Sequence, residues 1–122
     1  MQREATIVAT DGGKTVFRTE LLDFVPVADA APGGVFEATA LGEGSGGIVV
    51  FPPGFRAVFH NTLAPTWMLM MAGEIEMEVS DGARRTFGAG DVIRFEDLDG
   101  PGHSSTTVGA QPAIAATVGF AP

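Results

Sequence analysis

Two side chains in this sequence are suited to moving protons near neutral pH, those of His60 and His103, the only histidines present. Imidazole titrates at about pH 6.5 in model peptides, so it can act as a general acid or as a general base. It is also a common metal ligand. Any site that uses imidazole must include His60, His103 or both, and we take both as candidate catalytic residues.

Residues that share a strand face with the histidines are expected to line a binding cavity. Alternate residues of a strand point to the same side, which places Val58 and Arg56 on the expected face of His60. Thr66, Met68 and Met70 share a face of the next strand. Such a lining is mostly apolar with a few polar groups, which suits a small organic ligand. The expected substrate-binding residues are Arg56, Val58, Thr62, Thr66, Met68 and Met70.

The two serines that follow His103 differ in the side they are expected to face. Ser104 is adjacent to the histidine and points away from it, whereas Ser105 returns to the same face. Ser105 is therefore a candidate for a hydrogen bond at the site.

The elements that must position these residues are strands. Short runs of β-branched and aromatic residues are separated by turn residues about every eight to twelve positions, which is typical of an all-β sandwich or barrel. Turns are expected at 11–13, 72–73 and 81–82, where glycine accepts a positive φ. One short segment, 19–24, is a helical candidate, and without crossover helices the sheets should be antiparallel. The expected strands cover residues 5–10, 15–19, 35–41, 48–51, 55–60, 67–71, 74–79, 84–87, 92–95, 104–108 and 113–120.

Length and charge limit the class of protein. The chain has 122 residues, which is about one domain, and 7 basic against 15 acidic side chains give a net charge of −8. This negative field repels phosphate backbones, so no nucleic-acid partner is expected. The sequence contains no run typical of a signal peptide or a transmembrane helix, so we expect a soluble, cytoplasmic protein with no membrane partner. The lack of cysteine excludes disulfides and thiolate metal sites.

Two further patterns have simple structural explanations. The glycines of 42–47 match the spacing of a dinucleotide-binding motif, but the residues that follow are typical of a strand rather than a helix, which favours a flexible loop or a hairpin. Glu74, Glu76 and Glu78 alternate with hydrophobic residues and are expected to form the solvated face of a strand.

The region 47–109 carries a resemblance to a known family. Gly54, five residues, His60, then Thr62, Thr66 and Gly73 resemble the first motif of the cupins. The run 90–95, followed by Gly102 and His103, resembles the second motif, and 96–103 is similar to a segment found in small single-domain bacterial cupins. The resemblance implies an all-β, double-stranded β-helix of the jelly-roll type that spans 1–122 as a single domain. It also implies a homodimer.

The resemblance further implies a metal site, from which this sequence departs. The matching positions are His60, Thr62 in place of a second histidine, Thr66 in place of a glutamate, and His103. Hydroxyl groups are weak ligands for divalent metals and bring no charge. Both possibilities stay open here: no cofactor, or a divalent metal held by His60 and His103, with substitute ligands from Glu96, Asp97 or Asp99.

Several functions are compatible with these residues. The first is an enzyme that moves a proton next to a carbonyl of a small organic substrate, as an isomerase, cyclase, lyase or decarboxylase, with His60 or His103 as the acid or base. The alternatives are a non-catalytic protein that binds a small ligand, and a metal-dependent oxygenase. The histidines could also be hydrogen-bonded core residues without a chemical role.

Overall fold

The computed structural model describes residues 1–31 and 34–120, which form twelve β-strands and no helix. The prediction of an all-β chain is confirmed. The short helix expected at 19–24 is wrong, because residues 19–23 pair with β1 as the second half of β2. The strands are β1 (Gln2–Asp11), β2 (Lys14–Asp23), β3 (Val25–Ala31), β4 (Gly34–Ala38), β5 (Ser45–Phe51), β6 (Arg56–His60), β7 (Thr66–Ala72), β8 (Glu74–Val79), β9 (Arg84–Gly88), β10 (Val92–Glu96), β11 (His103–Val108) and β12 (Ala113–Gly119).

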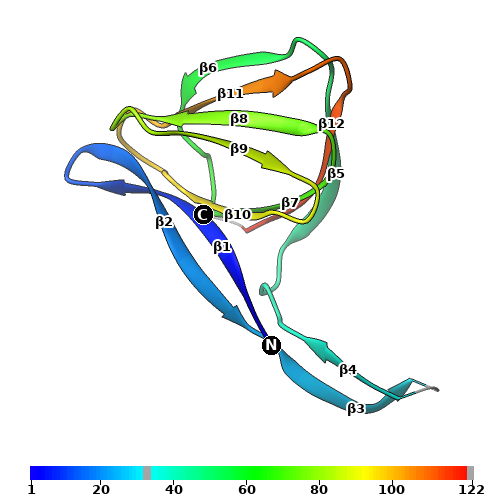
Figure 1. The fold of residues 1–122 in the computed structure, drawn as a ribbon. Coiled ribbons are helices and arrows are strands. Elements are labelled where there is room, and N and C mark those ends of the chain that lie inside the picture. Colours follow the sequence, from blue (N-terminus) through cyan, green and yellow to red (C-terminus); the bar gives the residue numbers. More distant parts are fainter. Residues whose placement is uncertain (32–33, 121–122) are drawn as a thin grey trace.

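The strands form two main sheets that face each other, and a separate hairpin. One sheet has the order β2-β1-β10-β7-β12-β5, and the other has the order β6-β11-β8-β9. The pairings are antiparallel, as expected, except that β1 and β10 run parallel. In Figure 1 the two sheets enclose a barrel, and the β3–β4 hairpin extends away from it.

The hydrophobic core fills the space between the two sheets. The six-stranded sheet contributes Val8, Met70 and Ile93, and the four-stranded sheet contributes Ile75 and Val79, all nearly fully buried. In β8 the buried residues alternate with the three glutamates, as the charge pattern predicted. Burial of apolar surface between facing sheets is the main favourable term for a fold of this kind.

Turns occur where glycine was expected to allow them. Gly12 and Gly13 connect β1 to β2 with φ of 57° and 81°, which are the values of a two-residue hairpin turn. Gly73, between β7 and β8, has φ of 69°, and a side chain there would collide with the backbone of Pro112. This close approach holds the end of β7 against the start of β12.

The outer surface carries one charged region and one apolar edge. On the four-stranded sheet, the hydrogen bond and charge of Glu78, and then the charge of Glu76, raise the pKa of Arg84 above its ordinary value. On the other sheet, the edge strand β5 exposes Ile48 and Val50, whose exposed fractions are 68% and 59%. Among the residues that the structure describes, no helix is long and apolar enough to span a membrane.

Candidate functional site

The structure brings His60 and His103 together. Strands β6 and β11 pair so that the two histidines are opposite each other, and their ring centroids are 4.8 Å apart with planes inclined by 51°. His103 is 5% exposed and stacks on Phe95, with 4.8 Å between ring centroids. His60, by contrast, lies in an exposed position. One imidazole is therefore inside the barrel and the other lies next to it on the solvent side.

Asp97 lies behind His103 and is completely buried, with 0% of its surface exposed. Its Oδ2 atom is 2.6 Å from Nδ1 of His103, and its Oδ1 atom accepts a hydrogen bond of 2.7 Å from the hydroxyl of Thr62. Both carboxylate oxygens thus have a partner. The hydrogen bond between Asp97 and His103 fixes the orientation of the imidazole.

The segment that carries Asp97 is held against the end of β6 by several hydrogen bonds. The backbone N–H of Thr62 donates to the carbonyl of Asp97 over 3.1 Å, and the Asn61 amide donates to the carbonyl of Gly100 over 2.7 Å. Gly102 approaches His60 so closely that a Cβ atom there would collide with the His60 carbonyl, and its φ is 77°. A glycine at position 102 therefore allows the close packing that brings both histidines to one site.

The hydrogen bonds determine which ring nitrogen of each histidine is free. Nδ1 of His60 is 2.8 Å from the carbonyl oxygen of Val58, and because a carbonyl only accepts, Nδ1 carries the hydrogen. Nδ1 of His103 likewise donates to the Asp97 carboxylate. In the neutral form of each ring, Nε2 is then an unprotonated nitrogen that can accept a proton.

The face predicted for β6 is wrong. Arg56 and Val58 do not line the cavity next to the histidines, and Val58 is 77% exposed. His103 pairs with His60, and Ser105 pairs with Ala57. Between these two pairs β6 advances by three residues and β11 by two, so β6 contains one extra residue. This β-bulge reverses the alternation, so Ala57 lines the cavity together with His60, while Arg56 and Val58 lie on the outer surface beside Glu76.

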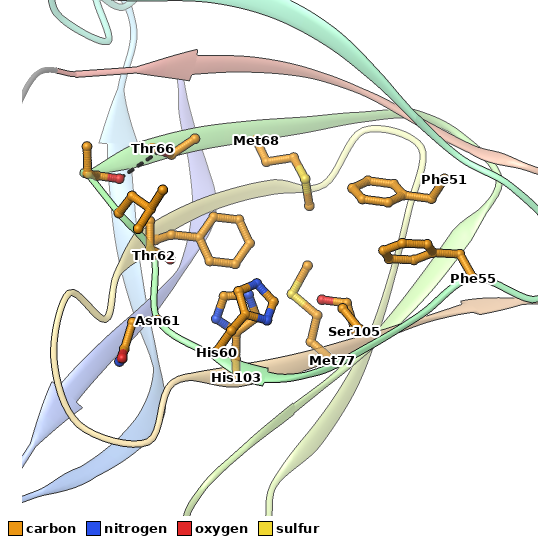
Figure 2. A pocket seen from close by; sticks show the side chains of 14 residues that line it. Phe51, Phe55, His60, Asn61, Thr62, Thr66, Met68, Met77, His103 and Ser105 are labelled. Carbon is orange, nitrogen blue, oxygen red and sulfur yellow. Dashed lines mark hydrogen bonds between the residues drawn. The ribbon is translucent and has the colours of Figure 1, made fainter.

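A cavity of about 470 Å³ adjoins both histidines. Figure 2 shows Thr62 and Thr66 on one side of it, Phe51 and Phe55 on the other, and the two imidazoles between them. The fourteen lining residues are Phe51, Phe55, Ala57, His60, Asn61, Thr62, Leu63, Ala64, Thr66, Met68, Met77, Phe95, His103 and Ser105.

Three of the expected substrate-binding residues line this cavity, namely Thr62, Thr66 and Met68, and their contact with a substrate stays a prediction. Met70 does not line it. It is on the same face of β7 but packs in the hydrophobic core, 3% exposed, farther along the strand from the histidines. Ser105 lines the cavity on the face of His103, as the alternation predicted, whereas Ser104 lies on the outer side.

Several lining residues were not identified from the sequence. Phe51, Phe55 and Met77 come from different segments of the chain, and nothing local distinguishes them from core residues. Simple alternation does not predict Ala57 in the lining, because it does not account for the bulge in β6. The sequence suggests Asp97 only as a substitute metal ligand, although its position six residues before His103 is the available signal for a partner of that ring.

The donor set at these positions does not fit a tightly held metal. Two imidazole Nε2 atoms are free, but the hydroxyl of Thr62 donates to Asp97 and the hydroxyl of Thr66 donates to the carbonyl of Ala64 over 2.8 Å. The two oxygens of Asp97 are occupied by His103 and Thr62. Among the described residues there is no group of three or more His, Cys, Asp or Glu side chains that could hold a metal ion. A divalent metal in proteins generally has at least three protein ligands, and these residues supply two.

Comparison with known proteins supports the fold. No protein-family model and no curated protein matches the chain. Among solved structures, a cupin 2 conserved barrel domain protein from Salinispora arenicola is 25% identical, with a TM-score of 0.54 over 82% of this chain and 76% of that one. The Schizosaccharomyces pombe Cnp3 cupin domain is 12% identical, with a TM-score of 0.52 over 98% of this chain and 84% of that one. Drosophila melanogaster CENP-C, solved bound to CAL1, is 17% identical, with a TM-score of 0.50 over 80% and 79%.

These likenesses agree with the architecture described above. Two facing sheets enclose a cavity, and the two histidines that resemble the motif positions meet on its wall. The same fold is used for many unrelated functions, so the likeness does not define an activity. The residues of this chain that the structure describes form one domain with the cupin fold.

Proposed function

We propose that this protein is an enzyme that moves a proton on a carbon next to a carbonyl group, with its small organic substrate inside the barrel. The observation that carries the proposal is the buried pair of Asp97 and His103, whose Nδ1 and Oδ2 atoms are 2.6 Å apart, at the wall of the cavity. A carboxylate that orients an imidazole and leaves its Nε2 free is the arrangement of a general base.

The chemical step follows from this geometry. Nε2 of His103 accepts a proton from the α-carbon, the C–H bond breaks, and its electron pair enters the enolate of the substrate. The ring becomes an imidazolium, and the adjacent carboxylate of Asp97 stabilises its positive charge. Return of the proton to another carbon gives an isomerase, and cyclases and lyases can proceed from the same enolate. A decarboxylase would form the enolate by losing CO₂, and the imidazolium would then protonate the carbon. No metal takes part in this proposed step.

His60 supports the proposal as a second proton carrier. Its ring is next to His103, with 4.8 Å between centroids, and it lies in an exposed position. With Nδ1 bonded to the carbonyl of Val58, its Nε2 is available to exchange a proton with the substrate or with solvent. The two imidazoles can therefore divide the roles of base and acid between them.

The burial of Asp97 also favours catalysis over a packing role for the histidines. Removing a carboxylate from water costs several kcal/mol of folding free energy before its partners compensate. A histidine needed only for packing or for passive ligand binding could be satisfied by a backbone carbonyl, as Nδ1 of His60 is by that of Val58.

The test uses 2-acetylnaphthalene, a neutral aromatic methyl ketone, in D₂O. We expect the protein to accelerate exchange of its methyl protons for deuterium, followed by NMR. The His103→Gln variant should lose at least about 100-fold of this acceleration, the usual contribution of a general base. Binding of the ketone with no acceleration over buffer would overturn the proposal and support a non-catalytic ligand-binding protein.

A further inference from the structure

The polar groups of the cavity differ in whether they are available to a ligand. Thr62 donates its hydroxyl hydrogen to Asp97, Thr66 donates to the carbonyl of Ala64, and the Asn61 amide donates to the carbonyl of Gly100. Ser105 lines the cavity and is nearly buried, at 6% exposed, and its hydroxyl has no hydrogen-bond partner among the described residues. It is therefore the hydroxyl donor that a ligand inside the barrel can use.

The lining of the cavity carries no fixed charge. Among its fourteen described residues there is no lysine, arginine, aspartate or glutamate. Asp97, the carboxylate that is hydrogen-bonded to His103, is not part of the lining. Arg94 pairs with Glu20 and Glu96 on the outer surface. A buried carboxylate or phosphate of a ligand would have no arginine or lysine partner here, and burial of an unpaired charge is costly.

The side of the cavity formed by Phe51 and Phe55 suits a flat ring in its shape and chemistry. The rings of Phe51 and Phe55 are 5.2 Å apart and inclined by 46°, and in Figure 2 they lie across the cavity from Thr62 and Thr66. The thioethers of Met68 and Met77 lie between these phenylalanines and the histidines. Aromatic and thioether side chains both make favourable contacts with planar unsaturated groups. The volume of about 470 Å³ equals that of roughly 16 water molecules at about 30 Å³ each, enough for a compound of one or two rings.

Ser105 and His103 lie close together on the same face of β11, as the proposed reaction requires. They are two residues apart on β11 and face the cavity together, so their Cα atoms are separated by about 6.6 Å along the strand. When the Ser105 hydroxyl binds a carbonyl oxygen, the neighbouring α-carbon can lie on the side of His103. A hydrogen bond to that oxygen is stronger when the enolate forms than in the ground state, because negative charge develops on it.

We propose that the cavity takes an uncharged, planar aromatic carbonyl compound, and that Ser105 donates the hydrogen bond that positions its carbonyl oxygen. This inference rests on the proposed proton transfer for its mechanistic part, since it identifies the substrate class and a positioning residue of the same site. The ligand preference itself can be measured without turnover.

The binding test compares three naphthalenes of similar shape by titration of the full chain: 2-acetylnaphthalene, 2-naphthoate and 2-methylnaphthalene. We expect the ketone to bind at least about tenfold more tightly than the carboxylate, because the lining has no lysine or arginine to compensate the charge of the latter. Ser105→Ala should weaken binding of the ketone by roughly three- to tenfold, because one hydrogen bond is lost. It should leave the affinity for 2-methylnaphthalene unchanged. Ser104→Ala, on the opposite face of β11, is the matched control and should change neither value.

Three outcomes would overturn the proposal: no binding of any of the three compounds, equal or tighter binding of 2-naphthoate, or an unchanged affinity of the ketone in Ser105→Ala. Selective binding of the ketone without deuterium exchange would support the ligand class while overturning the proposed enzyme function. Exchange that is accelerated without this selectivity would overturn the ligand class and support the enzyme. The two failures are therefore distinguishable.

Discussion

Asp97 and His103 form a buried carboxylate–imidazole pair, with Oδ2 of the aspartate 2.6 Å from Nδ1 of the histidine. Thr62 supports the pair from the other side, since its hydroxyl donates to Oδ1. Position 62 is one of those at which the resemblance to the cupin motif would place a metal ligand. In this chain Thr62 donates a hydrogen bond to the carboxylate of Asp97 instead, and this carboxylate is in turn hydrogen-bonded to His103.

The first prediction concerns this pair. Asp97→Asn should reduce deuterium exchange into 2-acetylnaphthalene by at least about 100-fold, because an amide can donate to Nδ1, reverse the tautomer of His103 and no longer stabilise the imidazolium. The measurement is NMR of the ketone, with circular dichroism to show that the variant is folded. Asp99→Asn is the control, since Asp99 is exposed and hydrogen-bonds through its backbone carbonyl. An Asp97→Asn variant as active as the original protein would exclude the pair from the mechanism.

The second prediction concerns metals. Exchange activity and the unfolding temperature should be unchanged after treatment with EDTA, because two imidazole nitrogens do not make a tight site. The double variant Thr62→His/Thr66→Glu restores the ligand types that the resemblance implies and should bind Zn²⁺ at least ~100-fold more tightly than the original chain. Titration calorimetry with Zn²⁺ measures both proteins. Tight, stoichiometric Zn²⁺ binding by the unaltered protein would contradict this account of the donor set.

The third prediction concerns the glycine that precedes His103. Gly102→Ala should lower the free energy of unfolding by more than about 2 kcal/mol, because the residue has a positive φ and its new Cβ would collide with the carbonyl of His60. Gly54 has the same φ of 77°, and no atom lies within 4 Å of the place that a Cβ would take. Gly54→Ala therefore measures the backbone strain alone and should lower the free energy of unfolding by about 1 kcal/mol. Urea unfolding measures both. Equal losses in the two variants would show that the close packing on His60 is unimportant.

The fourth prediction tests the bulge in β6. Ala57→Leu should fill part of the cavity and weaken binding of 2-acetylnaphthalene by more than about tenfold, the effect of losing contacts to one side of the ring. Val58→Leu changes the neighbouring residue on the outer surface and should have no effect on binding. The reverse result would mean that β6 follows a simple alternation and that Val58 faces the ligand.

The fifth prediction concerns the homodimer, which the resemblance implies and which stays untested. The exposed Ile48 and Val50 lie side by side on one face of the edge strand β5, where a second copy of this chain could cover them. We expect a dimer in sedimentation velocity and a monomer after Val50→Glu, since a charge in an apolar interface is unpaired. Val58→Glu adds the same charge on the other sheet and should leave the dimer intact. A monomer at all concentrations in the unaltered protein would remove this expectation.

The architecture was predictable from the sequence because local signals dominate it. Alternation in Glu74–Val79 and the glycine turns at 12–13 and 73 are properties of short segments, and the structure agrees with them. The strand β3, and the parallel pairing of β1 with β10, were not expected, because they have no comparable local pattern. The cytoplasmic location and the lack of a nucleic-acid partner stay predictions.

The site was predictable only in part. The two histidines, Thr62, Thr66, Met68 and Ser105 were found by alternation and by the resemblance, and all six line the cavity. Arg56 and Val58 were misplaced because a bulge adds one residue to a strand without any sequence mark. Met70 lies on the predicted face of β7 but in the hydrophobic core. How far a cavity extends along a strand depends on packing across the barrel, and the sequence of one strand does not determine this.

The short connection between β10 and β11 has two roles that cannot be altered independently. Asp97 and Gly102 are five positions apart. Asp97 is hydrogen-bonded to His103, and Gly102 allows the connection to pack closely against His60. A substitution that displaces this connection from His60 would also disturb the contact between Asp97 and His103. Variation that adapts the barrel to a different ligand should therefore accumulate on the opposite wall, around Phe51 and Phe55, where a change of shape leaves the proton chemistry untouched.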